Sequence, residues 1–313
     1  MKRTELLDTT EDILNKASFQ ISQRCVARPS CFDFAARRGG HLTFVKALVD
    51  IGSVSSEEAS ELHWISKCFS ATPLLIGDQT RKKPLEDDTI YLRYNVYAIT
   101  PKTFGNVIFL QMHPLITAGP GGYYVDLDGE AIRKRRQELG LSVGKLAELM
   151  GISRRTIYGY ERGMAKASVS AAYNLEWILG VPVAQPVDVF QKQPEEGGFF
   201  AAAKRLIVGN RLLQTVLRNF SRFDFSVAPT RRAPFDFVAQ LRKERLNIIG
   251  GVTCEKERDV NQRTEEIMSV SEVVNAKPVF ITDGKRVPEN NIPLIHSEEL
   301  TKIKCQEDLM AHL

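Results

Sequence analysis

The sequence predicts a three-domain chain in which an all-α helical unit lies between two α/β domains. Three observations support this fold class. The 313 residues exceed what one hydrophobic core normally holds, and 43% of them are hydrophobic. Residues 130–180 carry the pattern of short capped helices joined by a tight turn. Sequence blocks on either side of that unit recur in the same order. We place the domains at residues 1–122, 123–190 and 199–313.

Two short helices are predicted between Ser142 and Gly163. Ser142 can cap the first helix, because its hydroxyl accepts a hydrogen bond from an unpaired N–H group of the opening turn. Apolar residues then recur at helical spacing at Val143, Leu146, Ala147 and Met150. Gly151 follows where a backbone reversal favours positive φ. The first helix should therefore end at a tight turn.

The second helix of the pair is expected to begin after Ser153, which can cap it. Ile157 and Tyr160, three residues apart, are predicted to form the buried side of this helix. Ile152 is predicted to pack under the turn before it. The residues left pointing outward near its start are Arg154, Arg155, Tyr158 and Gly159. Gly163 closes the helix.

Further helices are predicted on both sides of this pair. Glu130–Leu139 forms one, with Ile132 and Leu139 inward and Arg133–Arg136 supplying positive charge. Val169–Leu179 closes the unit. Its inward residues are Ala172, Leu175, Ile178 and Leu179. A run of basic residues alone is usually a solvated surface. Beside two capped helices and an Arg-rich helix start, the run favours a DNA-binding unit.

The outward start of the second helix is the end that a recognition helix presents to the major groove. Arginine can bond two acceptors of guanine at once, and a serine at a helix N-terminus suits a phosphate. Base contacts are therefore predicted for Arg154, Arg155 and Tyr158. Phosphate contacts are predicted for Ser142, Lys145, Ser153 and Lys166. The candidate DNA-binding set is completed by Thr156 and Gly159.

Residues 130–180 resemble the lambda repressor/Cro-like helix-turn-helix family over their whole length. The pattern of that family is matched by Arg136, Gly140-Leu141-Ser142, Leu146-Ala147, Ile152-Ser153 and Glu161-Arg162-Gly163. The resemblance implies a structural ion pair between Arg136 and Glu161. The chain departs from the pattern at Val143, where the family often carries a Gln that contacts DNA.

An internal repeat flanks the helical unit. Two pairs of segments match, residues 31–36 (CFDFAA) with 234–239 (PFDFVA), and residues 71–78 (ATPLLIGD) with 276–283 (AKPVFITD). Between the paired blocks lie a strand-like run and a helix-like stretch. The runs are Leu42–Ile51 and Leu246–Val252, and the helix-like stretches are Ser56–Phe69 and Gln262–Val274. Recurrence in the same order indicates duplication of one α/β unit.

Each copy predicts a small mixed sheet with helix cover: a strand ending in Phe-Asp-Phe, a hairpin to a second strand, a helix and a third strand. This layout resembles that of restriction-endonuclease-like nucleases. Those enzymes hold Mg²⁺ with an Asp on one strand and an acidic residue two positions before a Lys on the next. The first copy offers Asp33 and Lys46, but Phe44 occupies the position of the second acid.

The second copy lacks more of this pattern. Asp236 persists, while the lysine position falls on Ile249 or Gly250. Without a second carboxylate a hard cation loses a charged ligand. Other acids that could supply one are Asp50 and Asp78. We therefore expect both domains to be degenerate, with no catalytic residues and no metal, and Asp33 to brace its sheet. Cleavage at Asp33 and Lys46 is the alternative.

Taken whole, the chain resembles archaeal helix-turn-helix transcriptional regulators, in which a Cro-like unit follows an N-terminal domain of this kind. The segments that carry the resemblance are 32–38 (FDFAARR), 73–77 (PLLIG), 85–94 (LEDDTIYLRY) and the helical unit through Leu179. The match covers most of residues 12–190 and returns in 232–283. It implies binding of double-stranded DNA and regulation of transcription.

The charge balance requires a local binding patch. The net charge is only +4, but residues 129–180 hold nine Lys or Arg against five Asp or Glu, a surplus of four. The five cysteines show no metal-ligand spacing, which fits a reducing cytoplasm and no zinc site. They are Cys25, Cys31, Cys68, Cys254 and Cys305. No cofactor is expected.

Targeting and membrane segments are not expected either. Met1–Asp12 is acidic and lacks the long apolar core of a signal peptide. No run approaches the ~20 apolar residues that a membrane span needs. We therefore expect a soluble, cytoplasmic protein.

Breaker residues set the domain boundaries. Residues 118–122 (AGPGG) precede a short strand at Tyr123–Asp128. Gln191–Gly198 is a polar linker, and a helix over Phe199–Phe220 opens the third domain. That helix is the expected counterpart of Leu6–Ser18.

A single Cro-like unit grips only a few base pairs, so such units usually work in pairs on half-sites about 34 Å apart. We expect a homodimer built mainly by the α/β domains. The predicted function is sequence-specific regulation of transcription. The alternatives are a metal-dependent nuclease, and a DNA-associated interaction scaffold whose α/β domains dock a partner or a small effector. The sequence identifies no effector.

Overall fold

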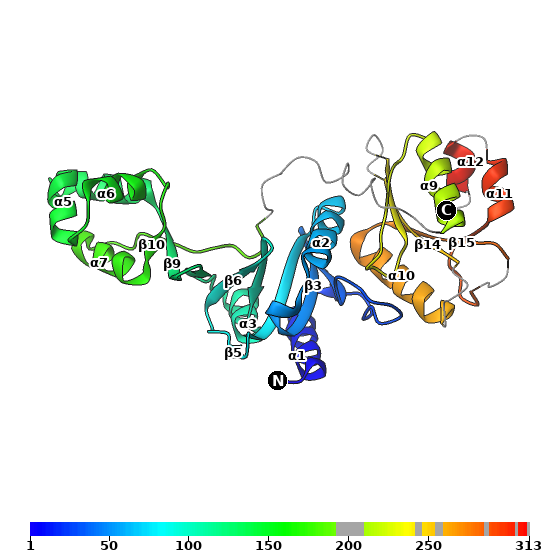
Figure 1. Ribbon diagram of the computed structural model, residues 1–313, viewed down its shortest axis with the longest axis horizontal. Helices are drawn as coiled ribbons and strands as arrows, with labels where there is room; N and C mark the ends of the chain where they lie inside the picture. Colours follow the sequence, from blue (N-terminus) through cyan, green and yellow to red (C-terminus); the bar gives the residue numbers. More distant parts are fainter. Residues whose placement is uncertain (192–209, 242–245, 254–258, 285–287, 304–305, 312–313) are drawn as a thin grey trace. The chain divides into compact units, whose positions relative to one another are not determined.

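The computed structural model describes residues 1–191, 210–241, 246–253, 259–284, 288–303 and 306–311. Figure 1 labels their helices and strands. The chain divides into two compact units. Unit 1 comprises Met1–Lys2, Val49–Gly52 and Ile76–Val189. Unit 2 comprises Arg3–Leu48, Ser53–Leu75 and Phe190–Leu313.

The first sheet of unit 2 follows helix α1 (Arg3–Lys16). The elements after α1 are β1 (Gln20–Ile21), β2 (Phe34–Arg38), β3 (His41–Asp50), α2 (Ser56–Cys68) and β4 (Thr72–Thr80). The strands lie in the order β1-β2-β3-β4, and β2 pairs antiparallel with β3. The last residues of β3 and β4 belong to unit 1. Apolar residues at period two on the strands and on one face of α2 fill the core. They include Phe34, Phe44, Leu62, Ile65 and Leu74.

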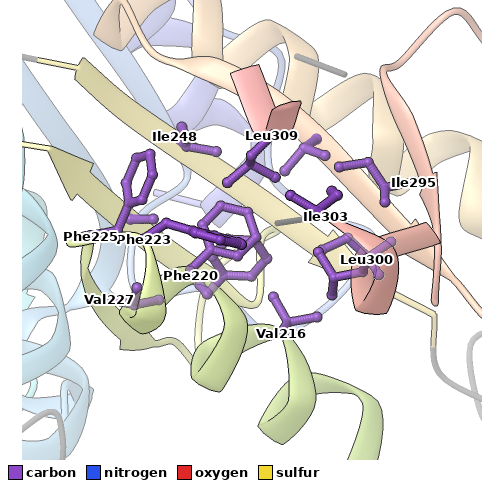
Figure 2. Packing of buried hydrophobic residues seen from close by; sticks show 14 of the residues in the cluster. Val216, Phe220, Phe223, Phe225, Val227, Ile248, Ile295, Leu300, Ile303 and Leu309 are labelled. Atoms are coloured by element: carbon purple, nitrogen blue, oxygen red, sulfur yellow. The ribbon is translucent and has the colours of Figure 1, made fainter. Parts of the chain in front are cut away.

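The second sheet of unit 2 repeats this course. Its elements are α9 (Arg211–Arg222), β12 (Ser226–Pro229), β13 (Phe237–Leu241), β14 (Leu246–Val252), α10 (Val260–Val274), β15 (Lys277–Thr282), β16 (Leu294–His296), α11 (Ser297–Lys302) and α12 (Gln306–Ala311). The strands lie in the order β12-β13-β14-β15-β16, with β14, β15 and β16 parallel. Figure 2 shows residues from α9, β14, β16, α11 and α12 meeting in one apolar core.

The Phe-Asp-Phe segments begin strands instead of ending them, contrary to expectation. In both copies the strand starts at the second Phe, at Phe34 and at Phe237. The Asp side chain explains this placement, because it accepts a hydrogen bond from the neighbouring strand. Asp33 Oδ2 accepts from Ala47 N at 2.8 Å, and Asp236 Oδ2 accepts from Val252 N at 2.6 Å. Each Asp therefore fixes the chain just before it enters the sheet.

Two buried glutamates join the two sheets of unit 2. Glu61 on α2 accepts hydrogen bonds from the backbone N–H groups of Arg231 (2.6 Å) and Arg232 (2.8 Å). Glu266 on α10 accepts from Val26 and Ala27, both at 2.8 Å. Burial raises the pKa of both glutamates. Each copy thus holds the segment between the first and second strands of the other.

Further contacts repeat this reciprocity. The Arg37 guanidinium on β2 donates to the carbonyl of Val273 at 2.5 Å, and the Gln240 amide on β13 donates to the carbonyl of Cys68 at 2.6 Å. The equivalent rings of Phe32 and Phe235 lie 6.3 Å apart. In an isologous twofold interface, residue i of one half contacts residue j of the other and the reverse contact is also made, while residues near the axis meet their own equivalents. The contacts between the two sheets follow this pattern. Here both halves belong to one chain.

Unit 1 contains a sheet with the strand order β4-β7-β6-β8-β9-β10, with β5 on β4 and β11 on β9. The elements before the helical bundle are β5 (Lys83–Pro84), β6 (Thr89–Arg93), β7 (Val96–Ile99), α3 (Pro101–Leu110), β8 (Ile116–Gly119) and β9 (Gly122–Leu127). The predicted strand at Tyr123–Asp128 is confirmed as β9.

The helical bundle of unit 1 matches the sequence pattern closely. It consists of α4 (Gly129–Glu138), α5 (Val143–Met150), α6 (Arg154–Glu161), β10 (Ala167–Ser168), α7 (Val169–Leu179) and β11 (Ala184–Gln185). Its core includes Ile132, Leu146, Ile157, Tyr160, Leu175 and Leu179. Leu139, predicted inward, is 41% exposed. The reason is that α4 ends at Glu138, so Leu139 caps the helix and has left its inner face.

Some expectations fall outside the described residues. The linker at Gln191–Gly198 is described only at Gln191, and the helix predicted over Phe199–Phe220 only from residue 210, where α9 begins at Arg211. Cys254 and Cys305 also lie outside. Among the helices that the structure describes, none has the length and apolar character needed to cross a membrane.

Candidate nucleic-acid interface

The paired helices α5 and α6 are held by the local signals that predicted them. Ser142 Oγ accepts from Lys145 N at 3.0 Å, and Ser153 Oγ accepts from Thr156 N at 3.1 Å. Gly151 ends α5 with φ of 65°, a value that costs little only for glycine. Both helices therefore begin with capped N-termini, whose partial positive charge favours anions.

A buried ion pair fixes α4 against α6. Arg136 Nε lies 2.5 Å from Glu161 Oε1, and Arg136 Nη2 lies 3.3 Å from Glu161 Oε2. Arg136 Nη1 also donates to the carbonyl of Leu141 at 2.8 Å. The two side chains are only 10% and 6% exposed. The pair predicted by the family resemblance is present, and both charges are used inside the bundle.

The start of α6 presents basic and aromatic side chains to solvent. Arg154, Arg155 and Tyr158 are all exposed, as the helical spacing indicated. Arg162, which the sequence reasoning did not select, lies with its guanidinium carbon 5.8 Å from the centre of the Tyr158 ring. Thr156 is half-buried, and its hydroxyl lies 2.9 Å from that of Ser153.

Gly159 is the one residue of the outward set that the structure places inside. It is buried, and a Cβ atom added to it would lie 3.2 Å from the side chain of Ala165. The reason is that the loop after α6 folds back over this position, where Met164 N donates to the Gly159 carbonyl at 2.8 Å. The expectation of an outward-facing Gly159 was therefore wrong.

Gly144 brings the two helix N-termini close together. A Cβ atom at this position would lie 2.9 Å from Nε, 3.0 Å from Nη2 and 3.1 Å from Cζ of Arg154. The guanidinium of the first α6 residue thus occupies the space that a larger residue on α5 would need. Gly144 is a positioning residue that sequence reasoning missed. The only signal was a glycine inside a predicted helix, where it is unfavourable.

The lysines predicted to touch phosphates are exposed but already engaged. Lys145 Nζ lies 3.1 Å from Glu148 Oε1, and Lys166 Nζ lies 2.7 Å from Asp126 Oδ2. Exposed pairs of this kind contribute little, typically about 0–1 kcal/mol, so a phosphate can replace the carboxylate at small cost. Ser142 and Ser153 are exposed at their helix N-termini.

The nuclease-like position of the first sheet is occupied by the chain's own cations. Asp33 Oδ1 accepts from Arg3 at 2.6 Å. Lys46 Nζ donates to the carbonyl of Ser30 at 2.6 Å and lies 3.5 Å from both Asp33 and Glu58. Glu58, on α2, is an acid near Lys46 that the sequence reasoning did not find. Phe44 is fully buried, with its ring 4.7 Å from that of Phe32.

In the second sheet an arginine replaces this arrangement. The strand register shows that Gly251 occupies the lysine position, because Val252 donates to Asp236 as Ala47 donates to Asp33. The expectation of Ile249 or Gly250 was wrong, since four residues separate β13 from β14 where two separate β2 from β3. Arg263 on α10 is fully buried, bonds Asp236 and donates to the carbonyl of Pro234 at 2.6 Å.

Asp236 holds a second cation as well. Arg28 Nη2 lies 2.8 Å from Asp236 Oδ1. The other acids considered as metal ligands are engaged in unit 1, where Asp50 accepts from Gly52 N at 2.7 Å and Asp78 lies 2.7 Å from the N-terminal amine. Within the part of the chain described, no group of three or more His, Cys, Asp or Glu residues is arranged to hold a metal ion.

The described cysteines are buried and form no disulfide bond. They are Cys25, Cys31 and Cys68. Burial raises the pKa of the Cys25 and Cys31 thiols well above the ordinary value. Both are therefore poor nucleophiles.

Two family profiles match the chain. Residues 3–114 match the PD-(D/E)XK superfamily domain, and residues 132–185 match the helix-turn-helix family. A protein of Pyrococcus furiosus named "Putative HTH-type transcriptional regulatory protein PF1851" is 31% identical over 99% of this chain and 97% of its own length. A "Putative HTH-type transcriptional regulatory protein" of Methanocella arvoryzae is 35% identical over 99% of this chain and 95% of its own length.

The chain belongs to this archaeal family of HTH-type transcriptional regulatory proteins. The family assignment covers both the N-terminal PD-(D/E)XK domain and the Cro/C1-type bundle, and the second α/β sheet follows them. Among solved structures, SinR in complex with DNA is 28% identical over 17% of this chain and 86% of that chain, with a TM-score of 0.16. The SinR/SinI complex is 27% identical over 18% of this chain and 54% of that chain, with a TM-score of 0.17.

Proposed function

We propose that this HTH-type regulator binds double-stranded DNA sequence-specifically by placing the start of α6 in the major groove. The observation that carries the proposal is the asymmetry of α6. Its inner residues Ile157 and Tyr160 are buried, while Arg154 and Arg155 at its capped N-terminus are exposed. Guanidinium groups at the start of a recognition helix match the paired acceptors of guanine.

The phosphate contacts in this proposal come from Ser142, Lys145, Ser153 and Lys166. The close approach of Gly144 to Arg154 supports this grouping, because it puts the N-termini of α5 and α6 side by side. Two capped helix ends and two lysines then flank the groove-reading residues. Phosphate contacts fix the register of the protein, while base contacts discriminate sequence.

We also propose that the two sheets of unit 2 are duplicated restriction-endonuclease-like domains without catalytic activity. In both sheets the aspartate of the Phe-Asp-Phe segment is already paired with a cation of the same chain, Arg3 at Asp33 and Arg263 at Asp236. A divalent cation would have to displace these groups. The observation that favours the nuclease alternative is Glu58, an acid 3.5 Å from Lys46.

A paired substitution tests DNA reading. Arg155→Ala should cost about 1–3 kcal/mol on the preferred site and relax selectivity at one base position. Lys145→Ala should weaken all sequences alike and reduce the slope of log K against log salt by about one. Lys134→Ala, an exposed cation on α4 outside the proposed face, is the matched control. Equal losses on specific and random DNA for Arg155→Ala would contradict the proposal.

The nuclease alternative is tested by metal dependence. A regulator binds its site equally well in chelator, and Mg²⁺ should produce no cleavage. Cleavage that appears with Mg²⁺ and disappears in both Asp33→Ala and Glu58→Ala would establish the alternative.

A further inference from the structure

Helices α1 and α9 occupy equivalent places in the two α/β copies. The short strand after each helix gives the register, because Gln20 lies opposite Arg37 and Ser226 lies opposite the equivalent Gln240. Each α9 residue therefore has a number 206 higher than its α1 equivalent.

Two local features agree with this register. The hydroxyl groups of Thr9 and Thr215 each donate a hydrogen bond to the carbonyl four residues earlier, at 2.7 and 3.1 Å. Ser18 and Asp224, just after the helices, both have positive φ, at 58° and 62°. The outer faces of the two helices can therefore be compared residue by residue.

The outermost positions of the two helices differ in charge. Residues at i, i+7 and i+11 lie within about 40° of one another around a helix. In α1 these positions hold two acids and a lysine, whereas in α9 they hold only arginines. The residues are Glu5, Asp12 and Lys16 in α1, and Arg211, Arg218 and Arg222 in α9. All of them are exposed. We call the α9 residues the arginine stripe.

The arginine stripe has no counter-charge of its own. Helix α9 contains no acidic residue. Among the residues that the structure describes, no ion pair involves the stripe. In the first copy the arginines near α1 are paired, since Arg3 lies 2.6 Å from Asp33 and Arg24 lies 2.5 Å from Glu11. The stripe is therefore available to an anion from outside the chain.

The helices that pack with α9 do so on its inner side. Figure 2 shows Val216 and Phe220 of α9 in one core with Leu300 of α11 and Leu309 of α12. Helical spacing puts the stripe on the opposite side of α9 from Val216 and Phe220.

The charged groups on the neighbouring elements leave the stripe uncompensated. Strand β12, which also packs on α9, has no charged residue. Those of α11 and α12, with the acid that follows α9, are Glu298, Glu299, Lys302, Glu307, Asp308 and Asp224. In the described part of the chain, none of these acids forms an ion pair with the stripe.

A row of arginines of this length matches the backbone of a duplex. The helix from Arg211 to Arg222 spans about 16 Å. Double-stranded DNA carries one negative charge per about 1.7 Å of its axis, so about ten charges pass along the stripe. A guanidinium group binds phosphate through two parallel N–H···O bonds, and each neutralised phosphate releases counterions.

The other anionic surface to consider is the outer face of α1 on a second copy. Its Glu5 and Asp12 have the same seven-residue spacing as Arg211 and Arg218. Exposed ion pairs contribute little, however, and two of them do not offset the freedom lost when two chains associate. DNA that α6 already holds makes its contact within one complex, so it avoids most of that loss.

We propose that the arginine stripe of α9 binds the phosphate backbone of double-stranded DNA, independently of base sequence. The inference rests on the proposed function, because α6 brings the DNA to the chain. It adds a second DNA contact, made by the second α/β copy and absent from the first.

The salt dependence of binding to random-sequence duplex DNA measures this contact. Replacing all the stripe arginines with glutamine should reduce the slope of log K against log salt by about 2–3, since each phosphate contact contributes about 0.9. The ratio of affinities for the preferred site and for random DNA should stay unchanged, because the stripe reads no base. An unchanged slope, or a changed ratio, would overturn the proposal.

Two further variants control for misfolding and for net charge. Arg211→Glu with Arg218→Asp gives α9 the acids that α1 carries at the equivalent positions, so the helix should fold, and the slope should again fall by about 2 or more. A charge-matched control removes exposed lysines elsewhere and should change the slope by less than about one. That control is Lys16→Gln with Lys134→Gln and Lys277→Gln. An equal fall in the control would show an effect of net charge alone and overturn the proposal.

Failure of this inference and failure of the proposed function give different results. In an Arg154→Ala, Arg155→Ala background, which removes the proposed base reading, the stripe substitutions should still reduce the slope by about 2–3. That reduction would support the stripe even if the chain preferred no sequence. Its absence in a chain that does prefer one sequence would overturn the stripe alone.

Sedimentation at low salt without DNA tests the second copy as occupant. The wild-type chain and a Glu5→Gln, Asp12→Gln variant should sediment alike. Self-association of the wild type that is lost both in this variant and in the stripe variant would identify a second copy as the occupant and overturn the proposal.

Discussion

Gly144→Ala should stabilise α5 and at the same time impair DNA reading. An alanine in a helix is favoured over glycine by about 0.5–1 kcal/mol, and a site in the first turn should lie at the lower end. The new Cβ would lie 2.9 Å from Arg154 Nε, while carbon contacts settle at about 3.5–4.0 Å. The guanidinium must therefore move by about 0.5–1 Å.

A shift of this size would break a bidentate hydrogen bond from the Arg154 guanidinium to a base, because the donor and acceptor atoms must lie about 2.7–3.2 Å apart. If Arg154 reads one base, the variant should lose about 1–3 kcal/mol of discrimination at that base, which is about 5- to 150-fold. Affinity for random DNA should stay the same. The variant should thus gain thermal stability while it loses base discrimination. A general loss of folding would lower both, so it cannot explain this result.

The assay is a set of anisotropy titrations on half-site duplexes that carry each of the four base pairs in turn, with thermal unfolding alongside. Gly40→Ala is the matched control, because a Cβ there meets nothing within 4 Å. In an Arg154→Ala background Gly144→Ala should change discrimination no further, since both act through one side chain. Additive losses in the double variant, or unchanged discrimination in Gly144→Ala, would refute the reasoning.

Three further changes probe the fold. Arg136→Met should cost about 3–5 kcal/mol in unfolding of the bundle, because it strands the buried Glu161 carboxylate, and replacing both partners with apolar residues should recover most of it. Arg263→Met should destabilise the second sheet by a similar amount, at the lower end because Arg28 still pairs with Asp236, as measured by urea unfolding. Burial raises the pKa of Glu61, so the folded state binds its proton more tightly, and stability should fall as pH rises from about 4.3 toward the raised pKa. Glu61→Gln should flatten that slope, and an unchanged slope would exclude Glu61 as its source.

The helical bundle was predictable because its signals are local. A capping serine, a glycine with positive φ and apolar residues at helical spacing each act within one or two turns of the chain. The Arg136–Glu161 pair came from family resemblance. Gly159 was misplaced because helical spacing does not show where the following loop folds back.

The contacts within unit 2 could not be predicted, because they join residues distant in the sequence. No local pattern indicates that Glu61 holds the backbone before β13, or that Arg263 on α10 reaches Asp236. The lysine-equivalent position in the second copy was misassigned for a simpler reason. Two more residues separate β13 from β14 than separate β2 from β3, so matching the two copies by residue type alone gave the wrong register.

The reciprocal packing of the two α/β sheets has an evolutionary consequence. In a homodimer every substitution appears in both halves at once, so a change that helps one half must be tolerated by the other. A tandem copy within one polypeptide removes that constraint. The first sheet holds Lys46 and Glu58, while the equivalent places in the second hold Gly251 and Arg263. The two halves of one chain can thus differ at equivalent positions, which two identical subunits cannot.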